Sequence, residues 1–304
     1  MFRSILLASA VVAASTTVSS AQVSLKPLVN ENSKVRTTIE VETDQTLTLN
    51  GMPLETKVSQ FLITNDTIGE KQADGKYTSI GTFETMQVEM HLPGGIELNF
   101  DSGNPKTDAP IPQLSAILEL FDAISSSKYE TSFTGPGKIE SVKITGDKYD
   151  ALDDALKGEF SPERIQQESA QQVERLPADP VKVGDTWNRT ETSQLGNGQT
   201  FEIERTFEYL GTVNEGGREL DRIGMKANSV TYAIEPNPSL PLEVKGSDLK
   251  IAKSSGEFLF DRKLGSTVKT TDSITVEGKL TLVANGQELA GDLNLTISSK
   301  TSRE

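Results

Sequence analysis

Few types of side chain in this sequence could act as catalytic residues or metal ligands. The sequence has 304 residues with a single histidine, His91, and no cysteine. A Ser-His-Asp triad would need His91 beside a nucleophile. His91 instead lies on the polar face of a predicted strand, near Gly94-Gly95. We therefore interpret it as a solvent-facing strand residue. Neither a Gly-x-Ser-x-Gly nor a His-Glu-x-x-His motif occurs, and one histidine without cysteine cannot build an ordinary zinc site.

Carboxylates are the remaining candidates, because the sequence contains 44 acidic residues. Paired carboxylates could hydrolyse glycosides, but with so many acids pairs are unavoidable, and the aromatic residues that stack on sugars are scarce. Residues 101–108 lack the third-, fifth- and twelfth-position ligands of an EF-hand. The group Asp147, Asp150, Asp153 and Asp154 decorates a predicted helix start. We therefore expect no catalytic residue, no metal site, no cofactor and no enzymatic activity.

The strongest local motif is Gly184-Asp185-Thr186-Trp187. One interpretation is a surface recognition loop with Trp187 as its anchor. The favoured interpretation is the start of a strand, with Gly184 in a turn, Asp185 bonded to its own backbone and Trp187 plugging the core. In the second case the motif is structural.

The N-terminus has the three parts of a secretory signal. Arg3 is followed by an apolar run from Ile5 to Ala14, which is too short to cross a bilayer, since that takes roughly 20 residues. Ser19 and Ala21 then form a small-x-small cleavage site. We expect residues 1–21 to be removed and the protein to be secreted or periplasmic. No later run is long and apolar enough to span a membrane.

The charge is strongly negative, with 30 basic against 44 acidic residues and a net charge of −14. Such a charge opposes binding to nucleic acid and to anionic membrane surfaces. The absence of cysteine in an exported chain also means that the core alone must stabilise it.

Period-two alternation of apolar and polar residues dominates the sequence and predicts strands. Turn pairs such as Asn50-Gly51 and Asn285-Gly286 separate these runs, and the second pair predicts a tight hairpin. The clearest predicted strands cover 35–42, 54–63, 77–92, 201–209 and 293–297.

The middle of the sequence is helical in pattern. Residues 112–126 have a broad apolar stripe at helical spacing, with Leu120 outside it. A short helix is predicted from Tyr149 to Phe160. A third, polar and mostly solvated, starts at Ser161-Pro162 and runs toward Leu176. The apolar stripe of the first helix consists of Ile111, Leu114, Ile117, Leu118, Phe121 and Ile124.

Two pairs of segments have a similar rhythm and suggest an internal duplication. Residues 54–77 resemble 201–222 in the spacing of two strands and a turn. Residues 137–146 resemble 256–265, each with glycines nine apart around a short alternating run. Chance similarity between antiparallel hairpins is the alternative.

The stretch from Leu176 to Trp187 resembles a family of bacterial secreted proteins of uncharacterised function. That family has Leu-Pro followed by Val-x-Val-Gly-Asp-x-Trp at the opening of a second β-rich half. Its accompanying motifs would be Phe100-Asp101-Ser102 and residues 256–265 here. The resemblance implies export and two β halves, and it carries no activity with it.

We therefore predict a mainly β, antiparallel protein with a few helices, built as two similar β halves around a helical middle. Curved half-barrels are one form of that fold. The expected parts are a first β half (22–146), a helical connector (147–176) and a second β half (177–304).

The expected function is that of an exported, soluble carrier or binding protein for a lipid or another apolar small molecule. Such a ligand would lie between one strand face and the apolar helix. The alternative is a non-catalytic structural or interaction protein of the cell envelope, with an envelope protein as partner. The predicted lining residues are Met86, Val88, Met90, Leu114, Leu118 and Phe121.

Overall fold

The computed structural model describes residues 22–304 except 108, 110, 154–155, 158–161, 197–198, 235–241 and 285. The predicted signal segment 1–21, Phe160 and the helix-capping Ser161 therefore lie outside the described residues. Among the described residues, no helix is both long and apolar enough to cross a membrane.

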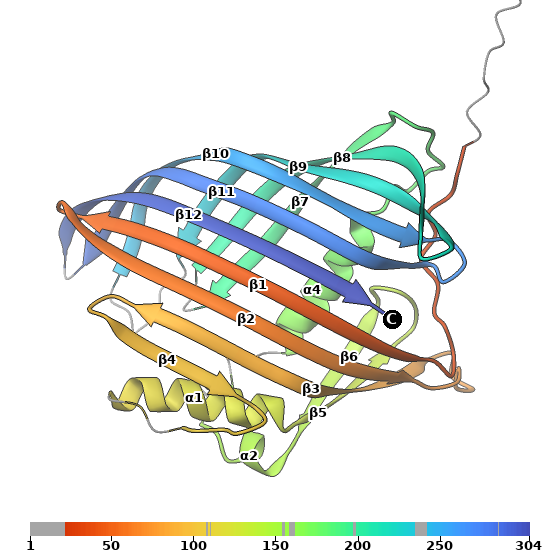
Figure 1. Cartoon of the computed structure of the whole chain (residues 1–304), viewed down its shortest axis with the longest axis horizontal. Helices are drawn as coiled ribbons and strands as arrows, with labels where there is room; N and C mark the ends of the chain where they lie inside the picture. The colour runs from red at the N-terminus through yellow and green to blue at the C-terminus, as the bar shows by residue number, and fades with distance from the viewer. Residues whose placement is uncertain are drawn as a thin grey trace, which may run out of the picture.

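The strands form one twelve-stranded antiparallel sheet (Figure 1). Its order is β6-β5-β3-β2-β1-β12-β11-β10-β9-β8-β7, and β4 pairs separately with β3. The sheet is strongly curved, with helices in the middle of the sequence, so the predicted fold class is confirmed. The strands are β1 (Lys34–Leu49), β2 (Met52–Ile68), β3 (Tyr77–Leu92), β4 (Ile96–Asp101), β5 (Lys128–Phe133), β6 (Ile139–Thr145), β7 (Thr186–Gly196), β8 (Gln199–Glu215), β9 (Arg218–Ile234), β10 (Leu242–Asp261), β11 (Ser266–Ala284) and β12 (Gln287–Arg303).

The first and last strands are neighbours in the middle of this sheet. β1 pairs with β12 from Thr37–Arg303 to Leu49–Gly291. β1 to β6 therefore continue directly into β12 to β7, and the two sheet edges are β6 and β7.

The hairpin turns follow the local sequence. Leu49 pairs with Met52, which leaves Asn50-Gly51 as a two-residue loop. Both residues have positive φ, 51° and 83°, the conformation that a type I′ turn requires. Ala284 likewise pairs with Gln287 across Asn285-Gly286, so the predicted tight hairpin is confirmed.

The sheet folds back on itself in its second part. Among the described residues, the β9–β10 ladder joins Asp221–Met225 to Gly256–Phe260. Beyond that point β8 and β9 lie over β11 and β12, because Phe201 and Tyr232 share a hydrophobic cluster with Val276 and Leu295. A second cluster packs Phe207, Ile223 and Phe258 at the other end of these strands. This part of the molecule therefore has a core enclosed between two strand layers.

Helix α1 (Pro112–Ser125) covers the first part of the sheet. Its Leu118 and Ile124 pack with Met86 and Phe100 of β3 and β4. One expectation about the helix is wrong: Ile111, assigned to the apolar stripe, is exposed, because it is the N-cap residue. Leu120, outside that stripe, is buried as well. Leu152 and Leu156, from the chain after β6, belong to the same cluster, so a second side of α1 is covered.

The described residues between β6 and β7 include the helices α2 and α4. α2 covers Asp147–Asp150 and is followed by a turn at Ala151. Leu156 and Lys157 are helical again, whereas residues 154–155 and 158–160 of the predicted second helix lie outside the described residues. α4 (Pro162–Glu174) has no buried residue, which confirms that it is mostly solvated.

Helix α4 connects the two edges of the sheet. On the β7 side, the amide of Gln171 accepts a hydrogen bond from the Thr192 backbone N–H (2.6 Å) and donates to the Thr192 carbonyl (3.2 Å). On the β6 side, a Cβ at Gly137 would lie 3.0 Å from the side chain of Val173. Gln171 thus takes the place of a neighbouring strand at an otherwise open edge.

The two pairs of segments that suggest a duplication differ in how well their positions in the sheet correspond. Leu54–Leu62 lies in β2 and Phe201–Leu210 in β8, each of which is followed by its antiparallel partner. Residues 137–146 contain the edge strand β6, whereas residues 256–265 contain the end of the interior strand β10. The duplication stays a prediction.

Candidate functional site

The structure brings all six predicted lining residues into one cluster. Met86, Val88 and Met90 of β3 lie with Leu114, Leu118 and Phe121 of α1. Met86, Val88 and Leu118 are at most 7% exposed. These three side chains are therefore core contacts between helix and sheet, which follows from the direct packing of α1 on β3 and β4.

A different part of the same face is left less covered. Val41 pairs with Ser299, and Ser299 pairs with Asp272, so the three side chains share a face. Asp272 contacts Arg205 of β8 on that face. We call it the inner face, because β8 and α4 lie on its side of the sheet (Figure 1).

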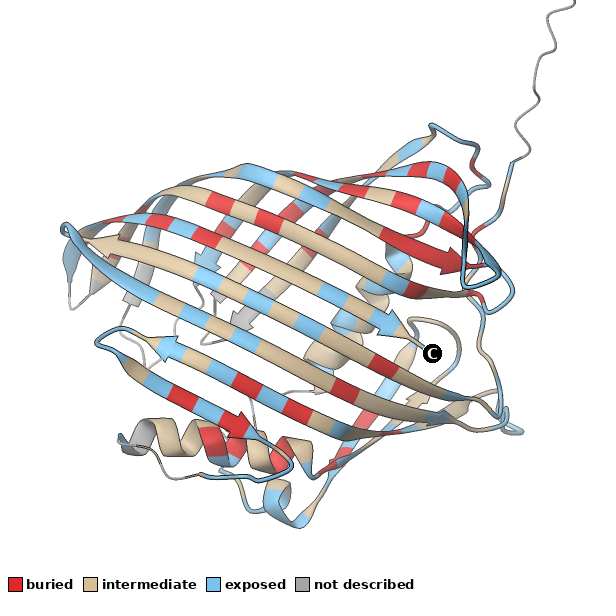
Figure 2. Ribbon diagram, viewed as in Figure 1, coloured by how far each residue is buried: buried red, intermediate tan, exposed pale blue. Residues whose placement is uncertain are grey.

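β1 lies in the middle of the sheet but has a single buried residue, Thr37 (Figure 2). Its inner-face side chains Ile39 and Val41 are half-buried. They lie in none of the four hydrophobic clusters that the described residues form. A strip of apolar surface thus runs along β1, between the cluster under α1 and the clusters under β7 to β9. Sequence alternation marked these residues as one face but did not show that they would stay only half-buried.

Charged side chains lie on the inner face at one end of this strip. Arg303 pairs with Thr37, and Asp66 of β2 pairs with Val35. Both side chains are half-buried. Burial lowers the pKa of Arg303 and raises the pKa of Asp66, and each charge partly offsets the effect on the other. A Cβ at Gly81, opposite Asp66 on β3, would lie 2.6 Å from Asp66 Oδ1, so the carboxylate rests against that glycine.

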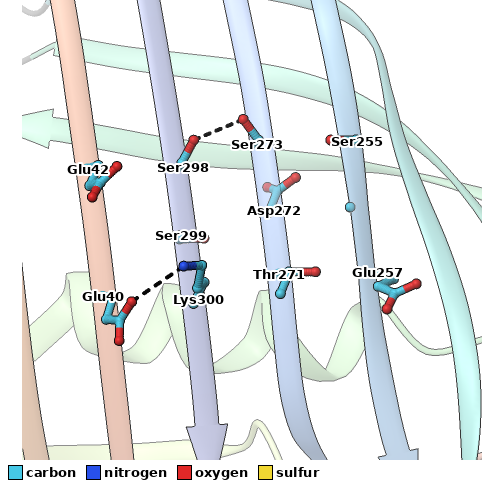
Figure 3. A pocket seen from close by; sticks show the side chains of 11 residues that line it. Glu40, Glu42, Ser255, Glu257, Thr271, Asp272, Ser273, Ser298, Ser299 and Lys300 are labelled. Atoms are coloured by element: carbon cyan, nitrogen blue, oxygen red, sulfur yellow. Dashed lines mark hydrogen bonds and ion pairs between the residues drawn. The ribbon is translucent and has the colours of Figure 1, made fainter.

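The opposite, outer face carries a pocket of about 440 Å³ over β1, β12, β11 and β10 (Figure 3). Glu40 and Lys300 are exposed there and lie 3.7 Å apart. The hydroxyls of Ser273 and Ser298 are hydrogen-bonded to each other at 2.9 Å. Polar and charged side chains line the pocket, and two of its hydroxyls satisfy each other. No histidine lines it, and its least exposed carboxylate, Asp272, is paired with Arg205 on the inner face. Its lining residues are Glu40, Glu42, Ser255, Gly256, Glu257, Thr271, Asp272, Ser273, Ser298, Ser299 and Lys300.

A row of buried charges crosses the interior beside the apolar clusters. Arg205 of β8 is 5% exposed and contacts Asp272 of β11 at 2.7 Å and Glu191 of β7 at 3.0 Å. Glu191 also binds Arg175, just after α4, at 2.7 Å. The sequence analysis missed this row of charges. Arg205 lies between Ile203 and Phe207, at a position of β8 where the alternation predicts an apolar residue. A charged residue at such a position is the signal that could have identified the row.

The Gly-Asp-Thr-Trp motif is a strand start, as expected. Gly184 has a φ of 89°, and Asp185 Oδ2 accepts a hydrogen bond from the Lys182 N–H. Trp187 is half-buried, stacks on Phe207 at 5.9 Å between ring centroids, and donates from Nε1 to the Arg175 carbonyl at 2.7 Å. It therefore fixes the end of α4 to the edge of the core.

Trp187 is the only tryptophan, so its fluorescence should report whether α4 is docked. Native emission should be blue-shifted relative to the unfolded protein, because the indole is stacked and hydrogen-bonded. Gln171→Ala removes the α4 contact with Thr192 and should shift the emission to longer wavelength. Gln172→Ala, at an exposed neighbour on the same helix, should leave it unchanged. A native emission like that of free tryptophan would contradict the docked geometry.

Other candidate residues have simple structural roles. His91 is exposed at the end of β3, with Nδ1 3.5 Å from Glu97 Oε1. Asp101 Oδ1 accepts a hydrogen bond from the Gly103 N–H in a turn. Within the described ranges, no group of three or more potential metal-ligating side chains occurs.

Fold and surface together define a class of protein: a curved antiparallel sheet with a partly covered apolar inner face and helices at its edges. The model of a family of unknown function, DUF6263, matches residues 74–216. The matched range runs from the turn before β3 to the turn after β8 and includes the Gly-Asp-Thr-Trp motif. No curated protein matches the chain.

Several solved structures are similar in part. A lipovitellin structure described by its lipid–protein interactions is 10% identical, with a TM-score of 0.45 over 90% of this chain. The present chain spans 25% of that protein's length. The translocator domain of the autotransporter NalP from Neisseria meningitidis is 7% identical over 89% of this chain and 88% of its own, with a TM-score of 0.19. A DUF1329 family protein from Desulfovibrio piger is 8% identical over 86% and 83%, with a TM-score of 0.12.

Proposed function

We propose that this protein is an exported, non-enzymatic carrier that holds an apolar chain along the inner face of β1. The observation that carries the proposal is the exposure of β1. A strand in the middle of a twelve-stranded sheet is expected to be covered on one face, but the inner-face residues Ile39 and Val41 are only half-buried. The tripartite segment 1–21 supports export.

Covering such a strip stabilises a complex through the hydrophobic effect. Each 100 Å² of apolar surface that is buried contributes roughly 2.5 kcal/mol before the cost of association is subtracted. Polar neighbours on the same face, Gln60 and Ser299, are half-buried as well. They leave the strip wettable when no ligand is bound, which suits a protein that must stay soluble in both states.

The test has two arms. The mass of the protein purified from its natural host should correspond to a chain that begins at or near Gln22. Native mass spectrometry of the same sample should detect a bound apolar molecule. In vitro, an environment-sensitive apolar dye should bind the folded protein at about micromolar affinity. Val41→Glu should weaken dye binding at least tenfold, because it places a charge on the strip.

Ser59→Glu is the matched control. Ser59 is exposed on the neighbouring strand and pairs with Glu42, so its side chain lies on the outer face. It adds the same charge without touching the strip, and dye affinity should stay as in the wild type. Equal loss of binding in both variants, or no binding to the folded wild type, would contradict the carrier function.

An envelope interaction protein is the second candidate. It is favoured by exposed apolar side chains at the tip of the β1–β2 hairpin, where Met52 is 67% and Leu54 is 37% exposed. Copurification with an envelope protein, together with no binding of an apolar molecule, would support this second function. The double variant Met52→Ser and Leu54→Ser should then abolish the copurification.

A further inference from the structure

Arg303 and Asp66 lie at one end of the apolar strip and on the same face. Thr37, Ile39 and Val41 alternate along β1, and Arg303 stands beside Thr37 on β12. Asp66 stands on the other neighbour of β1, two residues further along, opposite Val35. An extended molecule lying on Ile39 and Val41 along β1 would therefore bring one of its ends to these two charges.

Both charges are partly removed from water, and each has the other as an electrostatic partner without a direct contact. Among the described residues, neither side chain makes a hydrogen bond or an ion pair within 4.0 Å, although each influences the ionisation of the other. Half-buried charges are normally paired, because desolvation is costly. The guanidinium of Arg303 thus makes no hydrogen bond to the described residues, and its N–H donors can bind a ligand on the inner face.

Arg303 is the better placed of the two to bind a ligand. Asp66 rests against Gly81, whereas Arg303 has a long side chain, and its backbone is fixed in the β1–β12 ladder. Beyond it, the N–H groups of Arg36 and Glu304 donate to each other's carbonyls at 2.9 Å. Guanidinium groups bind carboxylates and phosphates through paired hydrogen bonds.

We propose that the carried molecule is a single-chain amphiphile with an anionic head group, that its chain lies on Ile39 and Val41, and that Arg303 binds the head group. This inference rests on the proposed carrier function. Asp66 lowers the positive potential at Arg303 and so moderates the affinity, which allows release.

The experiment compares two ligands that differ only at the head, hexadecanoate and hexadecanol, by titration of the mature protein. Arg303→Gln should weaken hexadecanoate binding at least tenfold and leave hexadecanol binding unchanged. Asp66→Asn should strengthen hexadecanoate binding several-fold, because it removes a nearby negative charge. Hexadecyl phosphate in place of hexadecanoate distinguishes a carboxylate from a phosphate as the preferred head group.

Lys300→Gln is the matched control, because Lys300 is exposed on the outer face of the same strand. It removes the same charge from the opposite face and should not change either affinity. Arg303→Lys keeps the charge without the paired donors and should recover only part of the binding.

The results separate the two proposals. If the protein binds both ligands and neither Arg303→Gln nor Asp66→Asn changes their affinities, the head-group assignment is overturned. The carrier function still holds in that case. Loss of both ligands to the same extent in Arg303→Gln would overturn the head-group assignment as well. Failure of the wild type to bind either ligand would refute the carrier function itself.

Discussion

Gly278→Ala should destabilise the protein by about 3–5 kcal/mol, or prevent folding altogether. Gly278 lies in β11 with a φ of 149°. A Cβ there would stand 2.1 Å from the Asp248 carbonyl oxygen and 2.9 Å from the Leu249 Cα. These atoms belong to the backbone of β10, which is paired with β11 over its whole length. The clash cannot be relieved by a side-chain rotation.

Urea unfolding followed by circular dichroism measures this effect. Gly246→Ala is the control, since Gly246 lies on β10 of the same pair and a Cβ there would meet nothing within 4 Å. Its expected change is less than about 1 kcal/mol. Similar midpoints for the two variants would mean that β10 and β11 do not approach as closely as described.

Arg205→Ala should lower the free energy of unfolding by about 3–5 kcal/mol, because it leaves the mostly buried carboxylate of Asp272 without its partner. Arg205 donates two hydrogen bonds to Asp272, at 3.1 and 2.7 Å, from one strand layer to the other. Glu191 keeps Arg175 after the change, so Asp272 bears most of the loss. The free energy of unfolding in urea, at neutral pH, gives the measurement.

Two further variants test the cause of that loss. Arg222→Ala removes an exposed ion pair with Glu257 between β9 and β10 and should cost less than about 1 kcal/mol. Arg205→Leu combined with Asp272→Leu removes both charges and should be more stable than Arg205→Ala. If the double variant is the least stable of all, the buried pair contributes net stability beyond satisfying its own charges.

Local order could be predicted from particular residues. Asn50-Gly51 indicated a turn and Asn285-Gly286 a tight hairpin, because residues of these types adopt positive φ readily. Pro112 and Pro162 mark the first turns of α1 and α4, where the missing N–H is not needed. Alternation in β1, β2, β3, β8 and β12 predicted their extended conformation. Each of these signals acts over a few residues, so one sequence is enough to read it.

The candidate site was not predictable in the same way. The sequence analysis placed the apolar surface at Met86, Met90 and Leu118, but α1 packs directly on that region and Leu118 is 2% exposed. The less covered strip lies on β1 instead. Hydrophobic alternation identifies which residues share a face, whereas coverage of that face depends on elements far away in the sequence.

The sequence by itself determined the β-rich class, the turns, the starts of α1 and α4, and the apolar faces of the strands with the clearest alternation. The tertiary structure decided that β1 meets β12, that the second part of the sheet folds over its own inner face, and that α4 connects the edges β6 and β7. It also placed Arg205 against Asp272 and left Arg303 beside a half-buried strip. The reason is physical: a period of two or 3.6 residues specifies a local conformation and a face. The partner of that face is selected by packing among residues tens to hundreds of positions apart, where many pairings satisfy the same local pattern.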